Sequence, residues 1–106
     1  MAKRGRAGER PERVEDIPGQ GERLRQLRNA YDYPTSNGFA ASLGITPTIY
    51  NGYENGIRLS LPSAIRIVRK IPGMTLDWLY FGKADGLPLD VARRLGLLEA
   101  PGKRRT

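Results

Sequence analysis

Residues 39–56 of the chain read FAASLGITPTIYNGYENG, and this is the most informative part of the sequence. Apolar residues before Gly44 fall at helical spacing, and glycine suits the left-handed backbone that a tight turn between helices requires. Thr46 and Pro47 indicate a new helix start, because threonine is a common N-cap residue and proline at the first helical position loses no backbone hydrogen bond. Gly56 ends this second helix. The stretch therefore predicts two short helices joined by a glycine turn.

Another helix is predicted before this stretch. Leu24, Leu27 and Tyr31 fall on one face of a helix with arginines between them, and the sequence Asp32-Tyr33-Pro34 ends it. Thr35 is then placed to cap the helix that precedes Gly44.

Three further helices are predicted after Gly56. Ser60-Leu61-Pro62 begins the first, Thr75 caps a short second one over residues 76–81, and Gly86-Leu87-Pro88 opens the third. No alternating strand pattern occurs in the sequence. The prediction is an all-α fold, a compact five-helix domain with a sixth, C-terminal helix. The apolar residues expected to face inward are Ala64, Ile65, Val68 and Ile71 in the fourth helix, and Leu89, Ala92 and Leu95 in the sixth.

The chain divides by composition into four parts. Residues 1–20 mix cations and acids with glycine and proline, and they contain too few large apolar side chains to offset the entropy of ordering. They are expected to form a flexible arm. The folded domain is expected over residues 21–83 and a C-terminal helix over 84–100, followed by a basic tail at 101–106.

The composition limits the kind of function. The chain has no cysteine and no histidine, so it lacks thiolate ligands, the commonest metal ligand and the usual general base. No metal, cofactor or enzymatic activity is therefore expected. No apolar stretch approaches the roughly 20 residues of a membrane span and no signal-peptide pattern occurs, so a cytoplasmic, nucleoid-associated location is expected. The net charge of +7 favours a polyanionic partner, with simple solubility as the other explanation.

Four segments in order carry a family resemblance. They are Arg23-Leu24-Arg25-Gln26-Leu27-Arg28, Gly44-Ile45-Thr46, Tyr53-Glu54-Asn55-Gly56 and Thr75-Leu76-Asp77-Trp78-Leu79-Tyr80-Phe81-Gly82. Together they lie within residues 21–82 and resemble the Cro/phage-repressor-like (lambda-repressor-like, XRE-type) helix-turn-helix DNA-binding family. The resemblance implies a transcriptional regulator, a repressor, that inserts the helix of residues 47–55 into the major groove of double-stranded DNA. It also implies a homodimer that binds half-sites about 34 Å apart.

The resemblance also assigns roles to individual residues. Positions that face base edges in the family correspond to Thr46, Pro47, Thr48, Asn51 and Gly52. Positions that contact phosphates correspond to Ser36, Asn55 and Arg58. Arg28 and Glu54 correspond to an internal ion pair with a structural role, and Tyr50 and Tyr53 to residues that pack inward.

Two of these positions depart from the family pattern. Gly52 stands where a long polar side chain is common, and Pro47 offers no hydrogen-bond donor. The remaining candidate base readers are Asn51, whose amide suits adenine, and Thr46 and Thr48, which suit a thymine methyl group or a single hydrogen bond. Gly52 either permits close approach of the backbone to DNA or marks lost specificity. The alternative function is therefore a protein-interaction adaptor that keeps the fold with little or no specific DNA binding.

Overall fold

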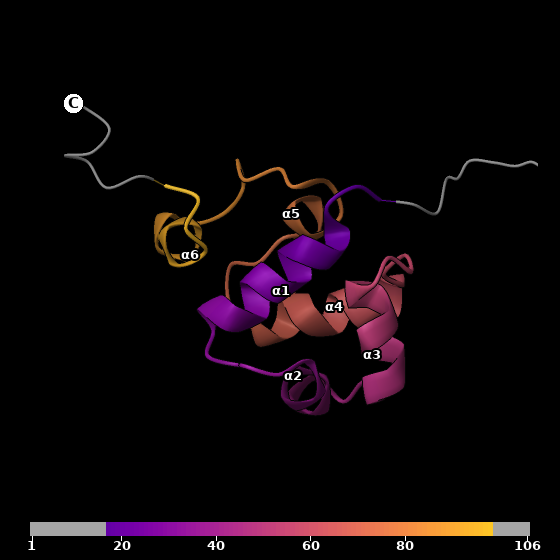
Figure 1. Cartoon of the computed structure of the whole chain (residues 1–106). Helices are drawn as coiled ribbons and strands as arrows, with labels where there is room; N and C mark the ends of the chain where they lie inside the picture. The colour runs from indigo at the N-terminus through magenta and orange to yellow at the C-terminus, as the bar shows by residue number, and fades with distance from the viewer. Residues whose placement is uncertain (1–16, 99–106) are drawn as a thin grey trace, which may run out of the picture.

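The computed structural model describes residues 17–98, which form six α-helices and no strand (Figure 1). The all-α prediction is confirmed for these residues. None of the described helices is long and apolar enough to cross a membrane. The helices are α1 (Gln20–Ala30), α2 (Ser36–Leu43), α3 (Pro47–Glu54), α4 (Leu61–Lys70), α5 (Leu76–Phe81) and α6 (Leu89–Arg94).

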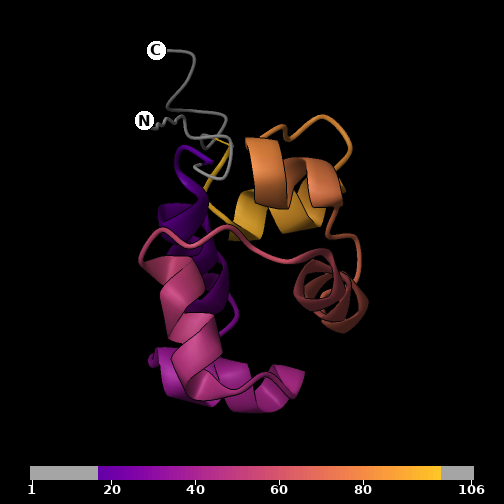
Figure 2. The same cartoon turned by 90° about the vertical axis from the view of Figure 1, so that its right-hand side faces the viewer.

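Helix α1 occupies the middle of the molecule and packs against α2, α3 and α5. In Figure 1, α2 lies below α1, α3 to its right, α4 behind it and α5 above it. Figure 2 looks onto α3 from the outside, with α2 crossing the lower end of α3. This arrangement leaves one long side of α3 uncovered by any other described helix.

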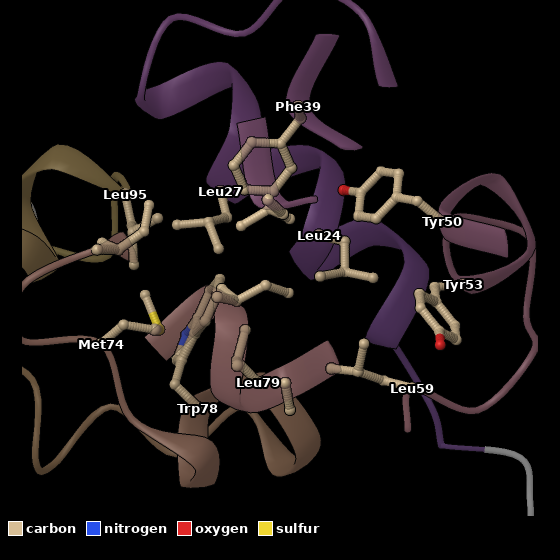
Figure 3. Close-up of a cluster of buried hydrophobic side chains, with 14 of the residues drawn as sticks. Leu24, Leu27, Phe39, Tyr50, Tyr53, Leu59, Met74, Trp78, Leu79 and Leu95 are labelled. Atoms are coloured by element: carbon tan, nitrogen blue, oxygen red, sulfur yellow. The ribbon is translucent and has the colours of Figure 1, made fainter. Parts of the chain in front are cut away.

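The core lies between α1 and the helices around it. Leu24 and Leu27 of α1 are buried at its centre, with Phe39 of α2 on one side and Trp78 of α5 on the other (Figure 3). Burial of this kind contributes about 1.5–3 kcal/mol for each large apolar side chain. The remaining buried apolar residues are Ala40, Leu43, Ile45, Tyr50, Tyr53, Leu59, Ala64, Ile67, Ile71, Met74, Leu79, Leu87, Val91, Ala92 and Leu95.

The helix starts after Thr35, Ser60 and Thr75 follow the predicted capping chemistry. Each of these side chains accepts a hydrogen bond from the backbone N–H three residues later. Such a bond satisfies one of the donors that a helix start leaves free, and is worth about 1 kcal/mol. Gly44 ends α2 with φ of 75°, the left-handed conformation that the glycine turn predicted.

The predicted inward face of α4 is partly wrong. Ala64 and Ile71 are buried as expected, but Ile67 is also fully buried, and Ile65 and Val68 are only half-buried. The inward stripe of α4 therefore follows a spacing of three and four residues through Ala64, Ile67 and Ile71.

The C-terminal helix is shorter than the predicted range of 84–100. Helix α6 spans six residues, and Leu89, which was expected to face the core, is 60% exposed. Val91 is buried in its place, together with Ala92 and Leu95. Pro88 precedes the first helical residue, so α6 starts five residues later than expected.

The N-terminal boundary also differs from the sequence prediction. Gln20 was assigned to the arm, but it is the first residue of α1 and is 2% exposed. Residues 17–19 of the predicted arm are also described, whereas its residues 1–16 and the tail at 101–106 lie outside the described residues.

Candidate nucleic-acid interface

Helix α3 has one buried face and one exposed face. Tyr50, Tyr53 and Glu54 point inward and are all at most 6% exposed. At 3.6 residues per turn, the residues that lie opposite them are Thr48, Gly52 and Asn55. Thr48 and Asn55 are exposed and Gly52 is half-buried, so the outward side of α3 is the side seen in Figure 2.

The start of α3 is open to solvent. Thr46, Pro47 and Thr48 are all exposed, as their assignment to a binding face requires. Thr46 occupies the N-cap position, as predicted, but its side chain makes no capping hydrogen bond. Its hydroxyl is therefore not used by the helix start, in contrast to that of Thr35 on α2.

An ion pair fixes α3 against α1. The Arg28 guanidinium donates to the Glu54 carboxylate with a shortest N–O distance of 2.8 Å, and the side chains are only 12% and 5% exposed. Arg25 approaches the same carboxylate at 3.6 Å and donates to the Glu54 carbonyl oxygen at 2.7 Å. The pair that the resemblance implied is thus brought together, and burial makes it sensitive to loss of either partner.

The same contact depends on a glycine in α1. A Cβ atom at Gly21 would lie 2.3 Å from the backbone carbonyl oxygen of Glu54, far inside van der Waals contact. The absence of a side chain at Gly21 therefore lets the backbones of α1 and α3 approach closely. Nothing in the sequence pattern around Gly21 indicates this role.

Tyr50 buries a polar atom beside this ion pair. Its ring packs edge-on against Phe39, with ring centroids 5.6 Å apart, and it enters the cluster in Figure 3 from α3. Burial raises the pKa of the Tyr50 hydroxyl well above its usual value, and its interaction with the nearby Glu54 carboxylate raises it further. No described residue lies in hydrogen-bonding geometry to this hydroxyl. Tyr50 is therefore a core residue, as predicted, with an unsatisfied polar tip.

Asn51 connects the outward side of α3 to the first turn of α2. The Ser36 hydroxyl donates to the Asn51 side-chain oxygen, and the Asn51 amide donates to the Asn37 side-chain oxygen at 3.2 Å. Ser36 and Asn51, which the family resemblance assigns to phosphate and base contacts, therefore lie in one network. Because both atoms of the Asn51 amide already have a partner, its orientation is fixed before any ligand binds. Asn37 was not among the predicted site residues, because no motif in the sequence marks it.

The loop after α3 is held by a buried glutamine. The Gln20 amide donates to the carbonyl oxygens of Tyr53 (2.9 Å) and Ile57 (2.8 Å), and the Leu59 N–H donates to the Gln20 oxygen at 2.8 Å. The Tyr80 hydroxyl donates to the Leu59 carbonyl oxygen at 2.8 Å, and burial raises the pKa of Tyr80. The loop that carries the exposed Arg58 is therefore anchored to α1 and α5.

Asn55 closes α3 rather than projecting freely from it. Its side-chain amide donates to the backbone carbonyl oxygen of Asn51 at 2.8 Å. The residue is nonetheless exposed.

Within residues 33–76, which include α2, α3 and α4, no acidic side chain is exposed. From Tyr33 to Leu76 the sequence contains one acid, Glu54, which is the buried partner of Arg28. The cations in the same stretch are all exposed. They are Arg58, Arg66, Arg69 and Lys70. The surface of α2, α3 and α4 is therefore positive, with no exposed carboxylate to offset it.

The chain was compared with known proteins by sequence and by structure. No family model, curated protein or solved structure matches it.

Proposed function

We propose that this chain is a sequence-specific DNA-binding transcriptional regulator, a repressor, of the lambda-repressor-like helix-turn-helix type. The observation that carries the proposal is the outward side of α3. This short helix is anchored by its buried face, and residues 33–76, which include α2, α3 and α4, have no exposed carboxylate. A helix presented in this way fits the major groove of B-DNA, which is about 12 Å wide.

In the proposed complex, the start of α3 meets the base edges. Thr46 and Thr48 offer hydroxyl and methyl groups, and Pro47 offers an apolar ring surface. Asn51 presents the remaining hydrogen-bonding capacity of its amide in the orientation that Ser36 and Asn37 give it.

Phosphate contacts are proposed on both sides of α3. Ser36 at the start of α2 lies on one side, and Asn55 and Arg58 after α3 lie on the other. Such contacts release counterions, so binding weakens as the salt concentration rises. A homodimer would place two such surfaces on half-sites about 34 Å apart, and selected sequences would then contain two related halves.

A protein-interaction adaptor is the second candidate, and one observation favours it. Ile49 of α3 and Ile57 in the loop after it are 53% and 64% exposed. Exposed apolar side chains in one place are common where a protein partner binds. In this reading α3 contacts a protein, and DNA binding is weak and independent of sequence.

The test is selection of duplexes from a random-sequence library by the full chain, followed by fluorescence-anisotropy titration of the selected duplex and a shuffled one. We expect the selected duplex to bind at least about 10³-fold more tightly than its shuffle. Arg58→Ala is expected to weaken binding to both duplexes and to lower the slope of log affinity against log salt by about 1.

Lys83→Ala is the matched control, because it removes the same charge from an exposed position after α5. It is expected to change affinity much less than Arg58→Ala. If the library yields no preferred sequence, or if both variants lose affinity equally, the proposed docking is wrong. Absence of DNA binding even at low salt would favour the adaptor.

A further inference from the structure

The side chain of Ile57 covers the position on α3 that lacks a side chain. A Cβ atom built on Gly52 would lie 2.9 Å from Cδ1 of Ile57, and two further Ile57 side-chain atoms lie within 4 Å of it. Gly52 is in the middle of the outward side of α3, between Thr48 and Asn55 on the helical surface. The apolar group at the centre of this side therefore comes from the loop after α3, not from α3 itself.

Ile57 is held in this place at both ends of its backbone. Its N–H donates to the Gly52 carbonyl oxygen at 2.9 Å, and its own carbonyl oxygen accepts from Gln20 at 2.8 Å. Isoleucine is branched at Cβ, which restricts its first side-chain torsion. The side chain is 64% exposed even though its backbone is fixed. A large apolar group is thus kept in water in a defined position.

On the strength of the proposed DNA-binding function, we propose that Ile57 reads thymine through its 5-methyl group. The methyl group of thymine is the apolar group that a base pair displays in the major groove, so it is the natural partner of an exposed aliphatic side chain at a groove-facing helix. The apolar side chain of Ile57 then occupies the place that a long side chain at position 52 would fill. The proposal assigns an A·T pair to the half-site position opposite Gly52.

The test replaces thymine by deoxyuridine, which lacks only the methyl group. Each thymine in the selected duplex is changed singly, and affinity is measured by anisotropy for the wild-type chain and for Ile57→Ala. For wild type, one position per half-site is expected to lose about fourfold in affinity, the value for one methyl group removed from water. For Ile57→Ala, the same replacement is expected to have no effect.

Two further variants make the test specific to this side chain. Leu89→Ala removes an equally exposed aliphatic side chain from α6 (60% exposed) and is expected to keep the full deoxyuridine effect. Gly52→Ala adds a methyl group where Ile57 lies, so it is expected to displace Ile57 and reduce the effect while α3 remains helical.

The possible results separate this inference from the proposed function. If a preferred duplex is selected but no thymine shows an effect that Ile57→Ala removes, the assignment of Ile57 is overturned and DNA binding stands. If no duplex is preferred at all, the proposed function is overturned and this inference with it. Circular dichroism of each variant confirms that a loss of affinity is not a loss of fold.

Discussion

The Tyr50 hydroxyl oxygen is a single atom whose removal is expected to change the stability of the protein very little. It is buried without a hydrogen-bond partner among the described residues, and an unsatisfied buried hydroxyl carries a desolvation cost. Tyr50→Phe removes the hydroxyl and keeps the ring that packs on Phe39. At neutral pH we expect this variant to be as stable as wild type, or more stable by up to about 1 kcal/mol.

The pH dependence has a defined sign. An unfolded tyrosine ionises near pH 10, whereas burial keeps Tyr50 protonated to a higher pH in the folded state. Below pH 10 the hydroxyl is neutral in both states and contributes no pH dependence. Above pH 10 the unfolded state alone loses the proton, so stability falls, by at most about 1.4 kcal/mol per pH unit for one group. Urea unfolding from pH 7 to 11.5 should therefore show a shallower alkaline decline for Tyr50→Phe than for wild type.

Tyr33 provides a control of opposite sign. Hydrogen bonding with Ser42 and Lys70 lowers the pKa of the Tyr33 hydroxyl, so this group ionises first in the folded state. Tyr33→Phe is expected to make the alkaline decline steeper. A Tyr50→Phe variant that is less stable at pH 7 by more than 1 kcal/mol would mean that this hydroxyl has a partner after all.

At the scale of the element, the contact between α1 and α3 decides how α3 is presented. Gly21→Ala would place a methyl group 2.3 Å from the Glu54 carbonyl oxygen, which is backbone and has little freedom to move. Alanine favours a helix over glycine by about 1 kcal/mol, but overpacking costs about 1–3 kcal/mol. We expect a net loss of stability, together with weaker pairing of Arg28 with Glu54.

Gly86→Ala is the matched control for this prediction. The nearest atom to a Cβ at Gly86 is in Thr75, at an ordinary contact distance of 3.7 Å. Thermal unfolding of both variants should show a lower midpoint for Gly21→Ala and little change for Gly86→Ala. Equal stability of the two variants would show that α1 and α3 can move apart without cost.

The elements also show how far the sequence predicts this structure. The starts of α2, α4 and α5 and the end of α2 followed from local chemistry, since a cap or a left-handed glycine acts within a few residues. The prediction for the inward side of α4 was partly wrong because Ile65, Ile67 and Val68 are all apolar. Which of them is buried depends on packing against other helices. The predicted C-terminal helix was longer than α6, because the leucines after Leu95 continue the apolar pattern beyond the residue where α6 ends.

The candidate site was predictable only for residues whose position depends on the local sequence and not on contacts with distant segments. Exposure of Thr46 and Thr48 followed from their place at a helix start. The partners of Asn51 on α2 and of Ile57 on α1 could not be predicted, because these contacts join segments 14 and 37 residues apart. Gln20 was placed in the arm because a single glutamine beside glycines carries no signal of burial.

At the scale of the whole molecule, Gln20 joins the start of the folded chain to the loop that follows α3. Its three hydrogen bonds satisfy the carbonyl oxygens of Tyr53 and Ile57 and the N–H of Leu59. Gln20→Met keeps a similar volume but leaves these buried backbone groups without their partner. An unsatisfied buried group costs about 1–3 kcal/mol, so we expect a clear loss of stability.

The same variant should loosen the loop that carries Ile57 and Arg58. Amide hydrogen exchange reports this directly, because the Leu59 N–H is protected by its bond to Gln20. In Gln20→Met we expect faster exchange at Leu59 than in wild type, with exchange in the middle of α1 changed only by the global loss of stability. If the proposed function holds, affinity for the selected duplex falls as well, since Ile57 and Arg58 are then less well positioned.

Gln26→Met separates the local effect from a general one. Gln26 lies on the same helix but donates to the Leu95 carbonyl oxygen, so it holds the end of α6 instead of the loop after α3. Its loss is expected to lower stability while leaving exchange at Leu59 protected to the same extent relative to the rest of the core. If Gln20→Met and Gln26→Met affect Leu59 alike, the loop is held by the fold as a whole. If only Gln20→Met speeds exchange of the Leu59 N–H, the buried side-chain amide of Gln20 positions the loop after α3 and with it the outward surface of α3.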